Sequence, residues 1–170
     1  RHAKSNWDNP ELRDIDRPLN PRGVVDAPLM ADRACWFGKP NEVWTSPARR
    51  ACRTAELMKS SWLEQIPVKV KDILYHGSAS EVLELIRKCD CEFHSIALFF
   101  HNPVITNLSN LLTSSMIHHI PTSGIVLIEA KVELWTQIEI GACTLKEFDY
   151  PKKQRSVSYT HLTLPTKRIV

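Results

Sequence analysis

The stretch Phe93-His94-Ser95-Ile96-Ala97-Leu98-Phe99-Phe100-His101-Asn102-Pro103 decides the fold class. Its apolar run ends at Phe100 and has the length of a buried strand. Asn102-Pro103 begins a helix directly afterwards, because proline suits a first helical turn. The same order occurs upstream, where a short apolar strand over 42–45 precedes Ser46-Pro47 and another helix. This alternation predicts an α/β fold of three layers, with a mostly parallel sheet and helices on both faces.

The other elements are predicted from hydrophobic period and helix-start signals. Asn20 can cap a helix over 20–37 that Gly38 ends, and Ser78 begins another helix with a capping-box pattern. Further predictions are a helix over 47–63, a polar loop over 3–18, and strands over 68–75, 124–129 and 134–140, the last two as candidates for pairing. We expect one domain, because 170 residues suffice for a single sizeable core.

Both strand–helix junctions carry polar side chains where α/β proteins bind ligands. Arg50 lies in the first turns of the helix after Ser46-Pro47, and His101 directly precedes Asn102-Pro103. In open α/β sheets, ligands bind outside the carboxyl ends of the strands, and helix N-termini favour anions. The pattern therefore predicts an anion site at this edge of the sheet.

Arg1-His2 completes a set of residue types that suits a phosphoryl group. A histidine can attack phosphorus, and two guanidinium groups can hold the equatorial oxygens with paired hydrogen bonds. A second imidazole can supply a further donor. Each of these residues alone has an ordinary interpretation as a solvated arginine or a core histidine, so the prediction depends on the set.

The motifs resemble those of the histidine phosphatase superfamily, which is phosphoglycerate mutase-like in fold. Within it, the sequence is most similar to the small SixA-like phosphohistidine phosphatases. Ala3, Phe100 and Val104 stand where the family usually has glycine. The segments that carry the resemblance are 1–2, 16–23, 46–55 and 99–104.

The resemblance implies a metal-independent phosphatase that needs no cofactor. His2 would attack phosphorus and carry the phosphoryl group as a covalent phosphohistidine. Arg1, Arg50 and His101 would bind the phosphoryl oxygens and stabilise the charge of the transition state. These four residues are the predicted catalytic set.

Three more residues are predicted at the substrate: Arg17, Asp16 and Asn102. Arg17 has the alternative of pairing with a nearby aspartate in the loop. Longer relatives place a glutamate after the strand that is predicted to end near Tyr75, and this sequence lacks it. Asp16 is therefore the candidate proton donor.

The predicted substrate is phosphohistidine on a protein. Imidazole leaves more readily than an alkoxide, and a domain over 1–155 has little chain for a lid that encloses a small molecule. One alternative is a small-molecule phosphomonoesterase on the same scaffold. Another is a catalytically weakened relative that binds phosphate or a phosphoprotein, because Phe100 and Val104 add bulk beside His101.

The sequence lacks the motifs of other phosphatase and phosphate-binding classes. No cysteine has the arginine spacing of a cysteine-based phosphatase, and the five glycines form neither a P-loop nor a G-x-G-x-x-G pattern. Asp14-Ile15-Asp16 follows a polar loop, where an aspartate-based phosphatase needs an apolar strand. His118-His119 has no cysteine or carboxylate at zinc spacing nearby, so no metal site is predicted.

The composition is typical of a soluble globular protein, with 43% hydrophobic and 24% charged residues. No apolar run is long enough to span a membrane. Five cysteines without regular spacing fit a reducing compartment, so we expect a cytoplasmic protein. Neither a membrane nor a nucleic acid is an expected partner.

The N-terminus is expected to be incomplete. A nucleophile on a sheet should follow a strand, so we expect a short apolar strand before Arg1. Without that strand, the chain is expected to be aggregation-prone and nearly inactive.

The C-terminal segment 156–170 is expected to be an adapter-derived, non-native tail. Residues 157–166 back-translate to the end of a transposon used in sequencing libraries. Such a tail should have no core to join, and its removal should leave thermal stability unchanged. Without Lys167 and Arg168 the formal net charge falls from +3 to +1, which leaves no basic patch for nucleic acid.

Overall fold

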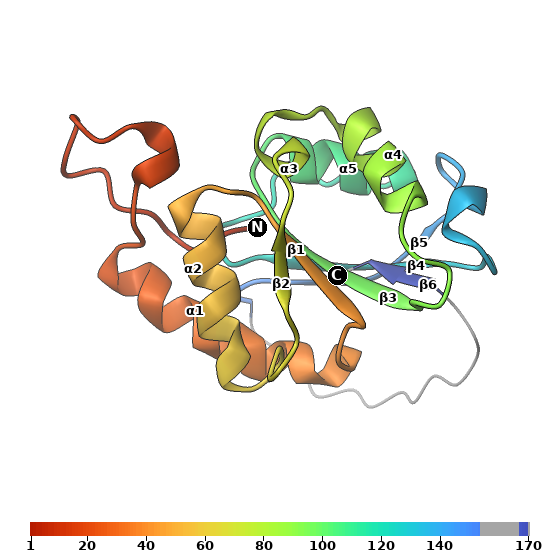
Figure 1. The fold of residues 1–170 in the computed structure, drawn as a ribbon, viewed down its shortest axis with the longest axis horizontal. Helices are drawn as coiled ribbons and strands as arrows, with labels where there is room; N and C mark the ends of the chain where they lie inside the picture. The colour runs from red at the N-terminus through yellow and green to blue at the C-terminus, as the bar shows by residue number, and fades with distance from the viewer. Residues whose placement is uncertain (154–166, 170) are drawn as a thin grey trace.

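The fold is a mixed six-stranded sheet with helices on both faces (Figure 1). The computed structural model describes residues 1–153 and 167–169. The sheet order is β2-β1-β3-β6-β4-β5; β2, β1, β3 and β6 are parallel, and β4 is antiparallel to both of its neighbours. This confirms the predicted α/β class. The strands are β1 Glu42–Thr45, β2 Val68–Val70, β3 Ser95–Phe99, β4 Ile125–Ala130, β5 Thr144–Asp149 and β6 Lys167–Ile169.

Five α-helices accompany the sheet in the described residues, and α1 and α2 lie on the opposite face from α4 and α5 (Figure 1). Two apolar clusters fill the two interfaces. Val43 and Ala97 pack with α1 and α2, and their neighbours Trp44 and Leu98 pack with α4 and α5. This alternation follows from the period of two along a strand. The helices are α1 Pro21–Ala34, α2 Arg49–Leu57, α3 Ile73–His76, α4 Ala79–Arg87 and α5 Val104–Thr113.

The predicted helix starts are confirmed for α1 and α4. Asn20 accepts a hydrogen bond from the backbone of Gly23 at 2.9 Å, and Ser78 and Glu81 form the capping box. The α-helix ends at Ala34 and continues as a 3₁₀ turn over Cys35–Phe37 before Gly38. The helix predicted over 47–63 is shorter, with α2 starting at Arg49 and a 3₁₀ turn after Leu57.

Two strand predictions are wrong. The segment 68–75 is a strand only over Val68–Val70, and Ile73–His76 is a helical turn. The segment 134–140 contains a 3₁₀ turn at Trp135–Gln137, where the side chain of Gln137 accepts hydrogen bonds from two backbone N–H groups. Local hydrogen bonds and the burial of Trp135 outweigh the strand pattern there. The strand that pairs with β4 is β5, further along the chain.

The prediction that the C-terminal tail has no core to join is wrong for Lys167–Ile169. This segment is β6, which lies between β3 and β4 and pairs with both. Strand edges need hydrogen-bond partners when they are buried, which is the physical reason for this insertion. Lys167 is only 2% exposed, and its amino group donates to the carbonyl oxygens of Cys91 and Phe93 at 2.9 and 2.7 Å. Residues 156–166 lie outside the described residues, and the origin of the tail stays a prediction.

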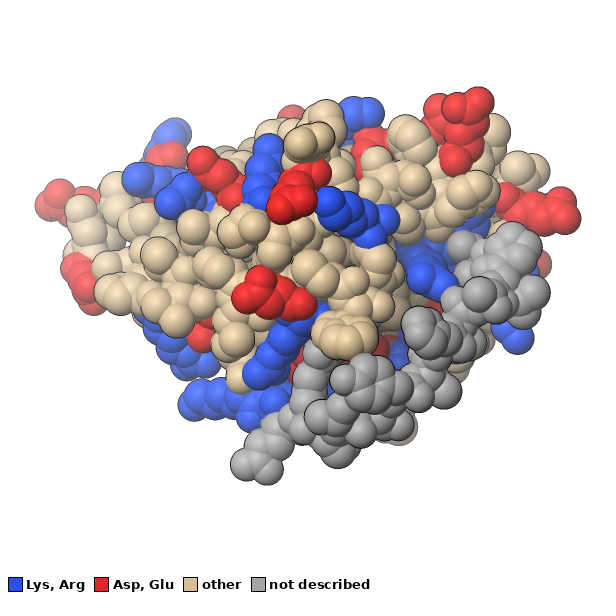
Figure 2. Space-filling model, turned by 90° about the horizontal axis from the view of Figure 1, so that it is seen from below, with Lys and Arg blue, Asp and Glu red and all other residues tan. Residues whose placement is uncertain are grey.

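The surface carries charges of both signs. On the face shown in Figure 2, Lys and Arg side chains are interspersed with Asp and Glu. Within residues 1–153 and 167–169, no helix has the length and apolar character needed to cross a membrane.

Candidate active site

The first two residues lie beside the carboxyl end of β3. The backbone N–H of His2 donates to Phe100 O at 3.2 Å, and Ser123 N–H donates to His2 O at 3.1 Å. The terminal amino group of Arg1 donates to Gly124 O at 2.8 Å. Residues 1 and 2 therefore bridge the end of β3 and the segment that leads into β4, and His2 is buried to 6% exposure.

The ring of His2 is oriented by the backbone. Its Nδ1 lies 2.7 Å from Ala3 O, a carbonyl that can only accept, so Nδ1 carries the proton. Nε2 is then left with its lone pair. The backbone N–H of Ala3 donates to Thr54 Oγ1 on α2 at 2.9 Å, which fixes this segment from the other side. Burial is the main cause that lowers the pKa of His2 to about 2, so the imidazole is neutral.

His101 follows β3, and its ring centroid lies 4.9 Å from that of His2. Its Nε2 is 2.8 Å from Ser46 Oγ, at the start of the segment that leads into α2. Its Nδ1 is buried and has no hydrogen-bond partner within the described part of the chain. A buried ring nitrogen without a partner, beside a second imidazole, is suited to contact a bound ligand. Burial lowers the pKa of His101 to about 3.

Arg50 lies on the first turn of α2, and it is 8% exposed. Its guanidinium donates to Asp14 twice, once to the backbone oxygen and once to Oδ2 at 2.8 Å. Tyr75 also donates its hydroxyl to Asp14 Oδ2, at 2.8 Å. Arg17 forms an ion pair with Asp14 Oδ1 and stacks on the Trp7 ring, 3.5 Å from its centroid. Two arginines therefore converge on one carboxylate at the rim of the site.

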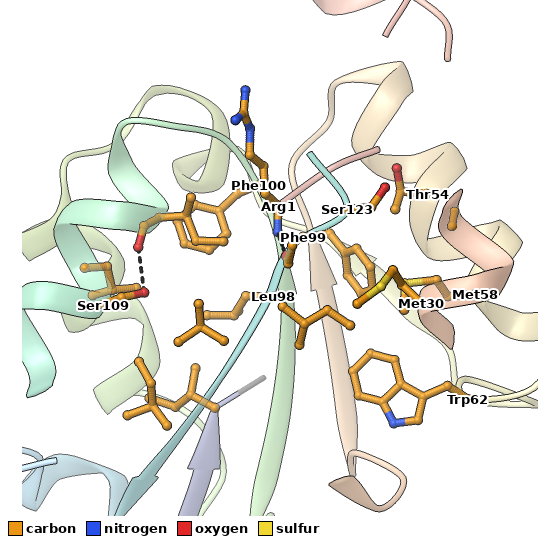
Figure 3. A pocket seen from close by; sticks show the side chains of 18 residues that line it. Arg1, Met30, Thr54, Met58, Trp62, Leu98, Phe99, Phe100, Ser109 and Ser123 are labelled. Atoms are coloured by element: carbon orange, nitrogen blue, oxygen red, sulfur yellow. Dashed lines mark hydrogen bonds between the residues drawn. The ribbon is translucent and has the colours of Figure 1, made fainter. Parts of the chain in front are cut away.

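Arg1 extends its guanidinium away from the apolar interior, as Figure 3 shows. Its Nη1 donates to Ile120 O at 2.9 Å and lies 3.0 Å from His119 Nε2. Asn102 donates to the same carbonyl at 2.9 Å, and its side-chain nitrogen lies 3.1 Å from His119 Nδ1. Burial, and then the positive charge of Arg50, lower the pKa of the Arg1 guanidinium.

The structure brings most of the predicted residues to one site. Arg1, His2, Arg50 and His101 are gathered at the carboxyl edge of the sheet. Arg17 and Asn102 reach this group through Asp14 and Ile120.

Asp16 is not brought to this group. It belongs to the same 3₁₀ turn as Asp14, but its carboxylate pairs with the exposed Arg13 at 2.7 Å. Two residues along a 3₁₀ turn point in different directions, so Asp14 faces Arg50 and Asp16 faces Arg13, and a role for Asp16 stays a prediction. Sequence reasoning missed His119, for which the sequence offers no signal beyond the pair of histidines.

Phe100 does not crowd the two imidazoles. Its ring is 2% exposed and belongs to the apolar cluster between the sheet and α4 and α5, where it lines a small cavity (Figure 3). Among the residues that the structure describes, no group of three or more His, Cys, Asp or Glu side chains is arranged to hold a metal ion.

Comparison with known proteins agrees with this geometry. The family model of the histidine phosphatase superfamily (branch 1) matches residues 1–75, which include Arg1, His2 and Arg50. The fold aligns with those of two SixA proteins. The N-terminal part of the chain is therefore similar to the histidine phosphatase superfamily, and the whole fold is similar to that of SixA.

Two SixA structures and one curated protein illustrate the similarity. The SixA protein of Agrobacterium tumefaciens has a TM-score of 0.74 and 25% identity, over 88% of this chain and 94% of that one. The protein histidine phosphatase SixA complexed with tungstate has a TM-score of 0.75 and 22% identity, over 88% and 93% of the two chains. An uncharacterised protein of Mycobacterium leprae is 28% identical over 168 residues, 89% of this chain and 99% of that protein.

Proposed function

We propose that the protein is a phosphatase that removes the phosphoryl group from phosphohistidine on a protein, through a covalent phosphohistidine at His2. The observation that carries this proposal is the state of His2: it is buried, neutral, and held with its Nε2 lone pair free. A neutral imidazole with a free lone pair is a nucleophile for phosphorus. The match of residues 1–75 to the superfamily model supports the same chemistry.

In this proposal, the surrounding cations stabilise the transferred group. Nε2 of His2 attacks phosphorus in line with the leaving group. Arg1 and Arg50 hold the phosphoryl oxygens, and Nδ1 of His101 supplies a further donor, since it has no partner within the described residues. Loss of one such charged donor typically lowers the rate by about a hundred- to thousandfold.

The choice of a protein substrate is supported by the open rim. Asp14 is 45% exposed on its side chain, and Trp7 in the adjoining loop is 67% exposed. A large substrate can therefore reach the site. The similarity to SixA proteins supports phosphohistidine as the group that is cleaved.

A comparison of substrates tests this function. We expect a phosphohistidine-bearing protein to be dephosphorylated with a kcat/KM well above that for sugar phosphates, since an alkoxide is the poorer leaving group. Release of inorganic phosphate measures both. A clear preference for sugar phosphates would favour the small-molecule phosphomonoesterase, and binding without turnover of any of them, or of an aryl phosphate, would favour a phosphate-binding relative.

The same assay tests the independence from metal. We expect turnover to survive a chelator, because guanidinium and imidazole groups supply the charge that the proposed mechanism needs. Vanadate should inhibit competitively, as an anion that resembles the transition state. Activity that a chelator removes and a divalent cation restores would contradict this part of the proposal.

A further inference from the structure

Asp14 occupies the rim of the site and has no role in the mechanism above. Its carboxylate accepts hydrogen bonds from the guanidinium groups of Arg50 and Arg17 and from the hydroxyl of Tyr75. The ring of Tyr75 lies 5.5 Å from the ring of His101, edge to face. With 45% of its side chain exposed, Asp14 is nevertheless within reach of an incoming substrate.

The direction of attack places the leaving group on the side of Asp14. His2 is only 6% exposed, so a phosphoryl group must reach it from the solvent side of the site. In-line displacement then puts the leaving group opposite His2, toward the exposed rim. Arg50 has five N–H donors and uses two of them on Asp14, so it can hold the phosphoryl group and Asp14 together.

Asp14 is suited to accept a hydrogen bond and not to donate a proton. Partial burial acts to raise its pKa, but hydrogen bonds from Arg50 and Tyr75 and the charges of Arg50 and Arg17 lower it to about 2. An alcohol needs a proton in order to leave. A phosphoimidazole that is protonated on its other ring nitrogen does not, because it leaves as a neutral imidazole.

We propose that the carboxylate of Asp14 selects the leaving group: it accepts the ring N–H of a phosphohistidine substrate, stabilises the protonated ring, and so favours a phosphoimidazole over a phosphate ester of an alcohol. This proposal rests on the proposed phosphatase function and assigns its substrate class to one side chain. Two of the three groups that hold the carboxylate are permanent cations, which keep it an acceptor.

The proposed step balances without another proton donor. Nε2 of His2 forms a P–N bond while the P–N bond to the substrate ring breaks, and the electron pair stays on the departing nitrogen. Water then attacks phosphorus, and the bond to His2 breaks with its pair returning to Nε2. Both protons of the water leave with the phosphate, as dihydrogen phosphate. Nδ1 of His2 keeps its proton throughout, on Ala3 O.

The substitution Asp14→Asn tests this role. We expect kcat/KM for a phosphohistidine peptide to fall about ten- to hundredfold, which corresponds to the loss of one charged hydrogen bond. Turnover of 4-nitrophenyl phosphate should change little, because its leaving group has no N–H and needs no proton. The backbone oxygen of residue 14 remains as a partner for Arg50, so vanadate affinity should be retained.

Each alternative role of Asp14 gives a different result. A proton donor would make alkyl phosphates lose more rate than aryl phosphates, and a purely structural role would lower all substrates and vanadate affinity together; either result overturns the proposal. Asp8→Asn is the matched control, since Asp8 is exposed in the same loop, and it should behave as the unaltered protein.

A binding measurement separates this proposal from the proposed function. A phosphonopyrazole peptide, which mimics phosphohistidine and cannot be hydrolysed, should bind the unaltered protein more tightly than the Asp14→Asn variant. Equal affinity would overturn the role of Asp14 even if turnover is normal. Absence of turnover with a clear difference in affinity would instead refute the phosphatase function and keep Asp14 as the selecting residue.

Discussion

Replacement of His2 by alanine is expected to abolish turnover and covalent labelling together. No other group in the described site combines burial, a neutral imidazole and a lone pair that no hydrogen bond occupies. His101 commits Nε2 to Ser46 and is the only other imidazole in ring contact with His2 within the described residues. A reaction that loses its nucleophile typically falls by on the order of 10⁴-fold or more.

The measurement is the trapping of phosphate on the protein. Incubation with substrate, quenching without acid and mass spectrometry of the peptides should place the phosphoryl group on His2, since phosphohistidine is lost in acid. His118→Ala is the matched control: His118 is exposed, and it should leave label and turnover intact. Vanadate should still bind the His2→Ala variant, because Arg1 and Arg50 remain. Label that persists in this variant would refute the assignment.

The sequence was most informative where a polar residue directly follows a predicted strand and precedes a predicted helix. The apolar run before His101 and the proline after it predict both a buried strand and the start of α5. Because β1 and β3 are parallel neighbours, their carboxyl ends bring Ser46 and His101 to within hydrogen-bond distance. That juxtaposition follows from topology alone.

The sequence pattern could not predict where side chains point in the irregular segments. Asp14 and Asp16 both lie in the loop before α1, and only the turn geometry decides that Asp14 faces Arg50. His119 contacts Arg1 because the loop between α5 and β4 brings it there. The sequence of that loop has no periodic pattern from which this contact could be predicted. Local patterns predict elements, whereas these contacts depend on how separate loops pack.

An apolar extension before Arg1 is expected to stabilise the protein and raise its activity. A cavity of about 40 Å³ lies between the start of the chain and β6, and its lining includes Leu98, Phe99 and Val126 (Figure 3). The amino group of Arg1 is buried beside it, and burial is the main cause that lowers its pKa to about 5. An uncharged amide and apolar side chains would suit this place better.

β6 has a composition that is unusual for a strand in the interior of a sheet. β6 puts Lys167, a cation, at 2% exposure between β3 and β4. Strands buried on both faces are normally rich in Val, Ile and Leu. An apolar extension that takes the place of β6 would bury two such side chains, which contributes about 3–6 kcal/mol. For a protein of this size, that corresponds to a rise in Tm on the order of 10 °C.

A comparison of two extensions measures this effect. Five apolar residues before Arg1 should raise Tm and kcat, whereas five Gly and Ser residues should not fill the cavity. Removing 156–170 should then destabilise the unextended chain, which loses β6, and leave the apolar-extended chain unchanged. Equal effects of the two extensions would contradict the expected filling of the cavity by apolar side chains.

The pH dependence of the stability tests the role of the buried Arg1 amino group independently. The amino group of Arg1 has an ordinary pKa of 8.0 and a folded pKa of about 5, so the unfolded chain binds more protons between these values. The stability of the unextended chain should therefore be fully present above pH 8 and fall as the pH drops toward 5. An extension converts this amine into an amide and removes the titration. The gain in Tm from the apolar extension should consequently be larger at pH 5 than at pH 8. A gain that is independent of pH would show that the buried amino group does not destabilise the unextended chain.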